Sequence, residues 1–185
     1  MNLIPIFPKE NPRIFAVRYD DQSVDEFERL FDLWNDSEYL ESFFYENQKD
    51  LCSGFNRCQS VDEAVRRTLE DVSRFEDHLL DLAESGDRDP SQALQALFEP
   101  LNNSEFRIIN LQKSKAKYWR SPWLRLYAIR IDVNCFVITG GAIKLTHKMN
   151  DREHTQFELE KLEKAKNYLI ETGLTDKESF EFLII

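Results

Sequence analysis

The clearest pattern in the chain is a β-hairpin between residues 121 and 146. Its first run, LRLYAIRI, reads with period 2 as two mostly apolar faces, with Arg125 on one face and Arg130 on the other. Its second run, CFVITGGAIKLT, is β-branched and aromatic until it reaches Gly140 and Gly141. Because paired glycines inside a strand are typical of a bulge or a close backbone approach, we predict one of these here.

Two further segments have the character of strands. Residues 13–19 (RIFAVRY) and residues 106–111 (FRIINL) are short runs of β-branched, aromatic and other apolar residues. A polar, lysine-rich connection over residues 112–121 joins the second run to the hairpin. We therefore expect three consecutive antiparallel strands, with residues 13–19 as a candidate fourth strand.

Helical periodicity fills the chain between the first strand and the sheet. Ser23 and Glu26 have the spacing of a capping box, and the apolar residues after them recur every three or four positions. Ser60 opens a second such box and a longer helix, which should end near Gly86 because glycine suits the position just past a helix. A short helix is expected over residues 91–98.

The carboxyl-terminal part also predicts a helix. Thr155 and Glu158 form another capping box, and the apolar positions that follow, beginning with Phe157, extend the helix to about residue 171. Gly173 should end it. Residues 180–185 are strongly apolar, so we expect them to dock against the body of the protein.

These elements predict an α+β fold, with an antiparallel sheet of three to four strands covered by helices and a long acidic helical insert after the first strand. With 42% hydrophobic residues, the chain can bury one core. We interpret residues 1–185 as a single domain with four parts, which are residues 1–22, 23–100, 101–150 and 151–185. No apolar run approaches the roughly 18 residues of a membrane span, and the start lacks a signal peptide, so we expect a cytoplasmic protein without a membrane partner.

Charge is distributed unevenly along the chain. The whole chain carries −10, yet residues 106–150 hold nine basic residues and one acid, a net +8 that leaves −18 for the rest. The basic residues are Arg107, Lys113, Lys115, Lys117, Arg120, Arg125, Arg130, Lys144 and Lys148, and the acid is Asp132. Because local potential decides what a surface attracts, a basic sheet flanked by acidic helices remains a candidate binding surface for anions.

Cysteine spacing and catalytic motifs exclude several function classes. Cys52, Cys58 and Cys135 cannot all pair and match no zinc pattern, so we expect reduced thiols, no metal ion and no cofactor. The chain has no phosphate-cradling glycine loop, nucleophile elbow, metalloprotease helix or EF-hand loop. His147, which follows the basic second strand of the hairpin, is a candidate acid or base near neutral pH.

The order of these segments resembles a known family. The run LRLYAIRI, a short turn, the run CFVITGGAIKLT and the helix HTQFELEKLEKAKNYL together resemble the carboxyl half of the RelE-like toxin superfamily, including its phage-derived members. The resemblance covers about residues 95–171. It implies a small α+β endoribonuclease that cuts messenger RNA, often on the ribosome, and that a cognate antitoxin protein holds inactive.

The resemblance also implies roles for individual residues. The catalytic candidates are Arg125 or Arg130 facing the scissile phosphate, together with Lys144 and His147 at the end of the second strand. The candidates for RNA binding are Lys113, Lys115, Lys117, Arg120 and Trp119. Trp119, Trp123 and Tyr127 are aromatic rings on which a base can stack, although packing is the alternative role for them. Strand alternation sends the two arginines to opposite faces, so both can serve one site only if a bulge intervenes.

Two alternatives come from other classes of protein, namely a noncatalytic interaction module and a protein with a structural role only. In a noncatalytic interaction module with the same fold, the basic hairpin would bind an acidic partner protein or balance the acidic helices of its own chain. The sequence leaves the oligomeric state open.

Overall fold

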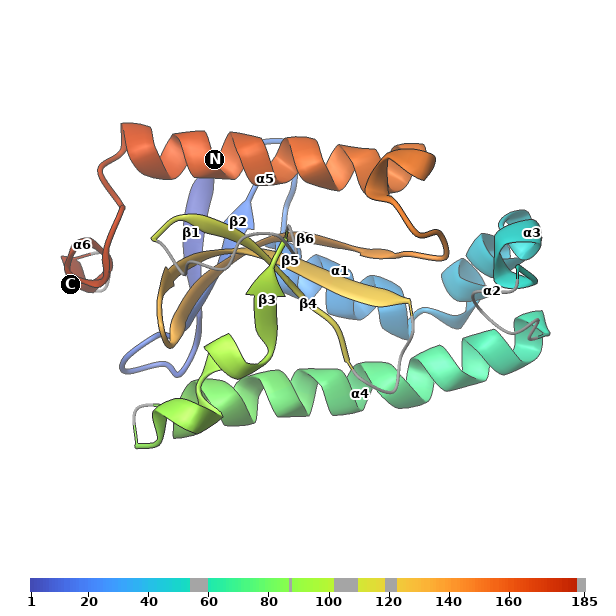
Figure 1. Cartoon of the computed structure of the whole chain (residues 1–185), viewed down its shortest axis with the longest axis horizontal. Coiled ribbons are helices and arrows are strands. Elements are labelled where there is room, and N and C mark those ends of the chain that lie inside the picture. Colours follow the sequence, from blue (N-terminus) through green and yellow to red (C-terminus); the bar gives the residue numbers. More distant parts are fainter. Residues whose placement is uncertain (54–59, 87, 102–109, 119–122, 183–185) are drawn as a thin grey trace.

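A six-stranded sheet runs through the middle of the molecule and carries helices on both faces (Figure 1). The computed structural model describes residues 1–53, 60–86, 88–101, 110–118 and 123–182. The strand order is β1-β2-β6-β5-β4-β3. The strands are β1 (Asn2–Phe7), β2 (Ile14–Arg18), β3 (Phe98–Pro100), β4 (Gln112–Ala116), β5 (Leu124–Asp132) and β6 (Cys135–Ile143).

The helices form two layers, because the sheet buries apolar side chains on both faces. One face packs against α1, α2 and α4, and the other packs against α5 and α6, as Figure 1 shows for α4 and α5. The α-helices are α1 (Glu26–Asn35), α2 (Ser37–Glu46), α3 (Gln48–Leu51), α4 (Val61–Ser85), α5 (Glu153–Glu171) and α6 (Lys177–Glu181). Short 3-10 helices in the described part of the chain are η1 (Pro90–Gln92), η2 (Leu94–Ala96) and η3 (Met149–Asp151). The α+β class and the helical insert between the first strands and the rest of the sheet are confirmed.

The sheet is larger than predicted and is mixed. β2, the predicted strand at residues 13–19, lies parallel to β6, whereas all other neighbours are antiparallel. A parallel pair needs a long crossover, and the helical insert supplies part of it. The proline-spaced amino terminus forms the additional strand β1, where Pro5 is tolerated because β1 lies at an edge of the sheet.

The predicted connection after residue 111 is also wrong in part. Residues 112–116 form β4, with Gln112, Ser114 and Ala116 buried in alternation. The sequence does not predict this strand because its side chains are mostly polar, and its alternating burial arises from pairing with β5. Most of the predicted strand at residues 106–111 lies outside the described residues. The predicted helix at residues 91–98 is wrong as well, because η1, η2 and β3 occupy that stretch.

Of the three predicted helix N-caps, the one at Ser60 is confirmed, and those at Ser23 and Thr155 are wrong. Ser60 accepts a hydrogen bond from the Glu63 amide, and α4 ends before Gly86 as expected. At α1 the cap is Asp25, two residues after the predicted Ser23. At α5 the helix begins at Glu153, and the Thr155 hydroxyl donates to earlier carbonyls instead of capping.

The carboxyl terminus docks through one aromatic ring. Phe180 is buried and meets Phe15 edge to face, with ring centroids 4.9 Å apart. Phe182 is 78% exposed, so the predicted docking extends only to Phe180 among the described residues. Gly173 ends α5 with a φ of +75°, as its position predicts. Among the described residues, no helix is both long and apolar enough to cross a membrane.

Candidate functional site

A β-bulge in β6 sets the direction of the side chains at the candidate site. Tyr127 pairs with Gly140 while Ala128 pairs with Ile138, so one residue of β6, Thr139, has no partner across the ladder. The bulge predicted from the glycine pair is therefore confirmed. After it, a side chain at Gly140 would point toward α5, whereas one at Gly141 would point toward α1.

Six basic or histidine side chains converge on one cavity of about 500 Å³, which we call the basic pocket. They are Lys115, Lys117, Arg125, Lys144, His147 and Lys148. The remaining walls come from Leu101, Tyr127, Met149 and Leu159, so none of the described lining residues is acidic. A concave surface lined by cations attracts an anion more strongly than the same charges dispersed on a flat surface.

Adjacent strands bring these side chains together. Lys115 on β4 lies directly opposite Tyr127 on β5, and Arg125 lies two residues before that tyrosine on the same face. Arg125 in turn pairs with Ala142 on β6, two residues before Lys144. The basic pocket therefore lies where the start of β5 and the end of β6 meet.

Backbone carbonyls hold several of the pocket's cations. The Lys144 Nζ atom donates to the carbonyl of Thr146 at 2.7 Å and to that of His147. Lys115 Nζ donates to the Leu101 carbonyl at 3.1 Å, and Arg125 Nη1 donates to the Leu124 carbonyl at 2.7 Å. Because carbonyls are neutral, these bonds orient the charges without cancelling them.

The cations of the basic pocket also disfavour one another. Burial lowers the pKa of Lys144, and the charges of Arg125 and Lys115 lower it further. Burial is likewise the main reason that the pKa of Lys115 and the pKa of Arg125 lie below their usual ranges. The negative charge of Glu99 offsets the pKa shifts of Lys115 and Arg125 in part, and its carboxylate also lies 3.3 Å from the Lys117 ammonium. A bound anion would relieve the remaining repulsion.

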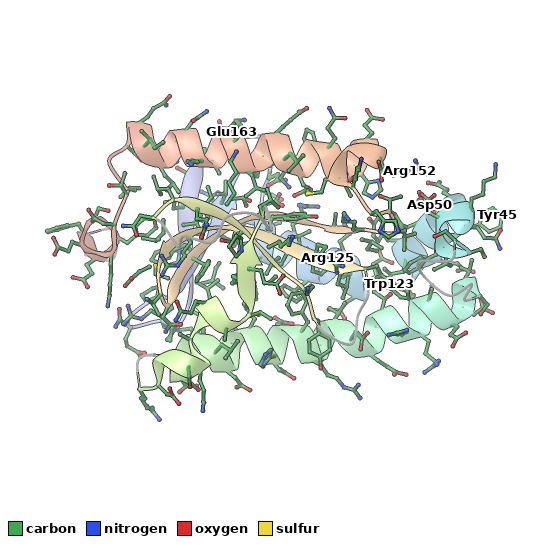
Figure 2. All side chains as sticks on the ribbon, in the orientation of Figure 1. Tyr45, Asp50, Trp123, Arg125, Arg152 and Glu163 are labelled. Carbon is green, nitrogen blue, oxygen red and sulfur yellow. The ribbon has the colours of Figure 1, made fainter. Side chains whose placement is uncertain are left out.

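The structure does not bring every predicted site residue to this pocket. Arg130 lies further along β5, does not line the pocket and is only 8% exposed. Lys113 forms an ion pair with Glu163, a residue that Figure 2 labels on α5. Trp119 and Arg120 lie outside the described residues.

The tryptophan and tyrosine predicted as stacking platforms have other surroundings. Trp123 is fully buried, and its indole N–H donates to the Thr68 hydroxyl at 3.0 Å, so it belongs to the core. Tyr127 lines the basic pocket, but its ring is 1% exposed and its hydroxyl has no hydrogen-bond partner among the described groups. Burial, offset in part by Arg125, raises the pKa of this hydroxyl, so it stays protonated and can donate.

A buried ion cluster lies beside the bulge. We use this name for Glu26 and Arg29 of α1 together with Glu158 and Lys161 of α5. The Lys161 ammonium bridges both carboxylates, at 2.6 Å from Glu26 and 3.0 Å from Glu158, while Arg29 binds Glu26 in bidentate fashion at 2.8 and 2.9 Å. A Cβ at Gly140 would overlap the Glu158 carboxylate, so glycine is what makes room for it.

Sequence periodicity missed this cluster. It placed Phe157 on the buried face of the last helix, but that ring is 58% exposed and Glu158 is buried in its place. The signal present in the sequence is the i, i+3 pair of Glu158 and Lys161 beside the apolar positions of the helix. Such pairs are common on solvated helix faces, so the pattern alone does not indicate burial.

The two carboxyls of the cluster differ in their acidity. Burial raises the pKa of Glu158 to about 7, although Lys161 opposes this shift. Burial acts on Glu26 in the same direction, but hydrogen bonds from Arg29 and the charge of Lys161 outweigh it, so the pKa of Glu26 lies below its usual range. Glu26 is therefore the anion of the cluster, and Glu158 titrates near neutrality.

Glu158→Gln should change how stability depends on pH. The folded protein holds the Glu158 proton more tightly than the unfolded chain, so between about pH 4.5 and pH 7 the wild type loses stability as pH rises. We expect the wild-type curve to fall below that of the variant by up to about 1.4 kcal/mol per pH unit in this window. Urea unfolding at pH 5, 6, 7 and 8 measures the difference.

The matched control for this measurement is Glu160→Gln, because Glu160 is an exposed carboxylate on the same helix. Its stability curve should run parallel to that of the wild type across the pH range. Equal pH dependence in the wild type and Glu158→Gln would contradict the assignment.

The comparisons with known proteins leave the family open. No protein-family model, curated protein or solved structure matches this chain.

Proposed function

We propose that this protein is a RelE-like toxin, an endoribonuclease that acts on messenger RNA, and that the basic pocket holds the scissile phosphate. The observation that supports this most strongly is the convergence of Lys115, Lys117, Arg125 and Lys144 with His147 and Lys148 around one cavity. The resemblance implies site roles for five of these six residues, which are Lys115, Lys117, Arg125, Lys144 and His147.

A phosphodiester suits the pocket in charge. Lysine and arginine side chains are the common ligands of phosphate oxygens, and here they project from three adjacent elements into one hollow. The pKa values of Lys144 and Lys115 are lowered by burial and by neighbouring positive charge, which a phosphate would offset. RNA binding by this pocket should therefore weaken steeply as salt rises.

The residues present can support cleavage through the ribose 2′-hydroxyl. In that reaction the 2′-oxygen loses a proton and bonds to phosphorus, while the bond to the 5′-oxygen breaks and that oxygen gains a proton. We assign Arg125 to the charge that builds up on the phosphoryl oxygens, since it faces the pocket whereas Arg130 does not. Lys144 and His147 lie at the same end of the pocket and are assigned to the proton transfers.

A cognate antitoxin belongs to the same proposal. A protein that inhibits this site needs carboxylates or other anions to fill a cavity lined by cations. Glu99, which already contacts Lys117 at the edge of the pocket, shows the kind of contact that such a partner would extend. The ribosome is the proposed setting in which messenger RNA reaches the pocket.

The test is cleavage of messenger RNA by the purified protein, with and without translating ribosomes. We expect cleavage by the wild type and at least a roughly tenfold slower rate for Arg125→Ala and for Lys144→Ala. Each variant should also lower the slope of log affinity against log salt by about one, because each removes one phosphate contact. Lys49→Ala, which removes an exposed lysine on α3, is the matched control and should behave like the wild type.

The outcomes separate the proposal from its alternative. RNA binding that depends on Arg125 and Lys144 without any cleavage would indicate a noncatalytic module that binds phosphate. Cleavage that survives both substitutions would place the active site elsewhere. Absence of both binding and cleavage, together with no growth arrest on expression, would overturn the toxin proposal.

A further inference from the structure

The basic pocket has aliphatic side chains as well as cations in its lining. Leu101 directly follows β3, Met149 is the first residue of η3, and Leu159 lies on α5. We call these three residues the apolar wall. All three are half-buried, so each keeps surface that a ligand in the pocket can contact. A phosphate group is wholly polar and gains nothing from such contacts, so the apolar wall suits a different part of a ligand.

The polar side of the pocket is formed by three cations that come from adjacent strands. Lys115 lies on β4, Arg125 on β5 and Lys144 just after β6, and Figure 2 labels Arg125. We call them the phosphate cations. Each is half-buried and is oriented by a hydrogen bond to a backbone carbonyl. Lys117, by contrast, already has the Glu99 carboxylate at 3.3 Å, so the phosphate cations are the stronger ligands for an added phosphate.

Helix α5 holds the apolar wall in place. The Thr155 hydroxyl, which belongs to a fully buried residue of α5, donates to the Met149 carbonyl and so ties η3 to the helix. Met149 and Leu159 also pack against the hydrophobic cluster between the sheet and α5. Leu101 belongs to the same cluster, and its carbonyl accepts the hydrogen bond from Lys115 at 3.1 Å. The apolar wall is therefore a supported surface that adjoins the phosphate cations.

The size of the pocket and the chemistry of its wall indicate the kind of ligand. A cavity of about 500 Å³ is in the range of sites that enclose a whole small molecule. A ligand that fills it carries an anion on one side and an apolar group on the other. The polarizable sulfur of Met149 favours an aromatic ring as that group. A nucleotide, which joins a phosphate to a flat aromatic base, has both features.

We propose that the basic pocket binds a complete nucleotide unit, with the phosphate on the phosphate cations and the face of the base packed against the apolar wall. This inference rests on the proposed function, because it assigns a second part of the same site. It makes Met149 and Leu159 residues that recognise the base and take no part in proton transfer. The same chemistry has two sources, a nucleotide within an RNA chain and a free mononucleotide.

The experiment is calorimetric titration of the full chain with one complete ligand and two partial ones. Adenosine 5′-monophosphate (AMP) is the complete ligand, ribose 5-phosphate lacks the base, and adenosine lacks the phosphate. We expect AMP to bind at least about tenfold more tightly than either partial ligand, because it gains both apolar burial and charged hydrogen bonds. None of the three has a phosphodiester bond to cleave, so binding is measured apart from catalysis.

Variants separate the two halves of the pocket. Met149→Ala and Leu159→Ala should each weaken AMP binding at least about fivefold and leave ribose 5-phosphate binding within about twofold of the wild type. Unchanged ribose 5-phosphate binding also shows that these variants are folded. Lys144→Ala should weaken AMP and ribose 5-phosphate binding by similar factors and leave adenosine binding unchanged.

The matched control for the apolar wall is Leu174→Ala. Leu174 is a half-buried leucine that packs against the same hydrophobic cluster but does not line the pocket. This variant should bind AMP and ribose 5-phosphate like the wild type. A loss of AMP binding equal to that of Leu159→Ala would assign the effect to a loosened core and overturn the role of the apolar wall.

A fourth ligand identifies the source of the nucleotide. A trinucleotide with 2′-O-methyl groups resists the proposed cleavage, because its 2′-oxygens carry no proton to lose. Binding of this RNA at least about tenfold more tightly than AMP would support a nucleotide within an RNA chain, since further phosphates meet further cations. AMP binding that is equal or tighter would support a free mononucleotide.

The remaining outcomes distinguish this inference from the proposed function. AMP that binds no more tightly than ribose 5-phosphate, or AMP affinity that survives both Met149→Ala and Leu159→Ala, would overturn the inference even if the protein cleaves messenger RNA. Failure of AMP to bind at millimolar concentration would also overturn it. Binding that depends on the base and on the apolar wall supports the inference, and it does so even if no RNA is cleaved and the proposed function fails.

Discussion

Lys161→Met is expected to lower the free energy of unfolding by about 3–5 kcal/mol at pH 8. The substitution leaves Glu26, which is fully buried, and Glu158, which is 6% exposed, without the ammonium that bridges them at 2.6 and 3.0 Å. Arg29 still binds Glu26, but Glu158 loses its only described ion-pair partner. Urea unfolding followed by tryptophan fluorescence measures the loss.

Lys164→Met is the matched control for this prediction, because Lys164 is exposed on the same helix. Its effect should stay within about 0.5 kcal/mol of zero. The cost of Lys161→Met should also be smaller at pH 5, where Glu158 is protonated and needs no counter-charge. Equal costs for the two lysines would show that the buried ion cluster does not stabilise the fold.

Gly141→Ala should cost about 3 kcal/mol, because it adds a methyl group where packing leaves no space. A Cβ at this position would lie 2.8 Å from the Arg125 carbonyl oxygen and 2.9 Å from the Trp34 ring. The first obstacle is backbone of the neighbouring strand, and the second is a ring that is 1% exposed. Neither can move without disturbing the β5–β6 ladder or the packing of α1, so the unfolding midpoint in urea should fall.

A double-mutant cycle with Trp34→Phe tests the mechanism. The smaller ring removes the atom that the new methyl group would meet, so Gly141→Ala should cost at least about 0.5 kcal/mol less in the Trp34→Phe background. A cost that is the same in both backgrounds would assign the effect to the Arg125 carbonyl and to the Leu30 side chain, whose Cδ1 atom lies 3.0 Å from the added Cβ. A cost near zero in both would contradict the close approach of α1 to β6.

The sequence predicts the basic pocket only in part. Counting charges along the chain was sufficient to predict a basic sheet, and Lys115, Lys117 and Lys144 do line one pocket. The sequence does not decide which of Arg125 and Arg130 lines the pocket. Alternation separates the two arginines onto opposite faces, but only the position of α5 and the chain after β6 shows which face is hollow.

The sequence does not predict the buried ion cluster. Glu26 and Lys161 are 135 positions apart, and each lies in a helix whose charges are typical of a solvated surface. Their burial results from side chains of two helices on opposite faces of the sheet meeting beside β6, at the point where Gly140 leaves space. A pattern within one helix contains no information about which distant helix will cover it.

The sequence by itself determined the features that depend on neighbouring residues: the α+β class, the bulge in β6, the cap at Ser60 and the end of α4. These depend on side-chain periodicity and local hydrogen bonds, which act over a few positions. The tertiary structure alone decided the parallel pairing of β2 with β6, the face on which Arg125 meets Lys144, and the burial of Glu158. Each of these depends on segments that are far apart in the chain and meet only when the core forms, so packing determines them.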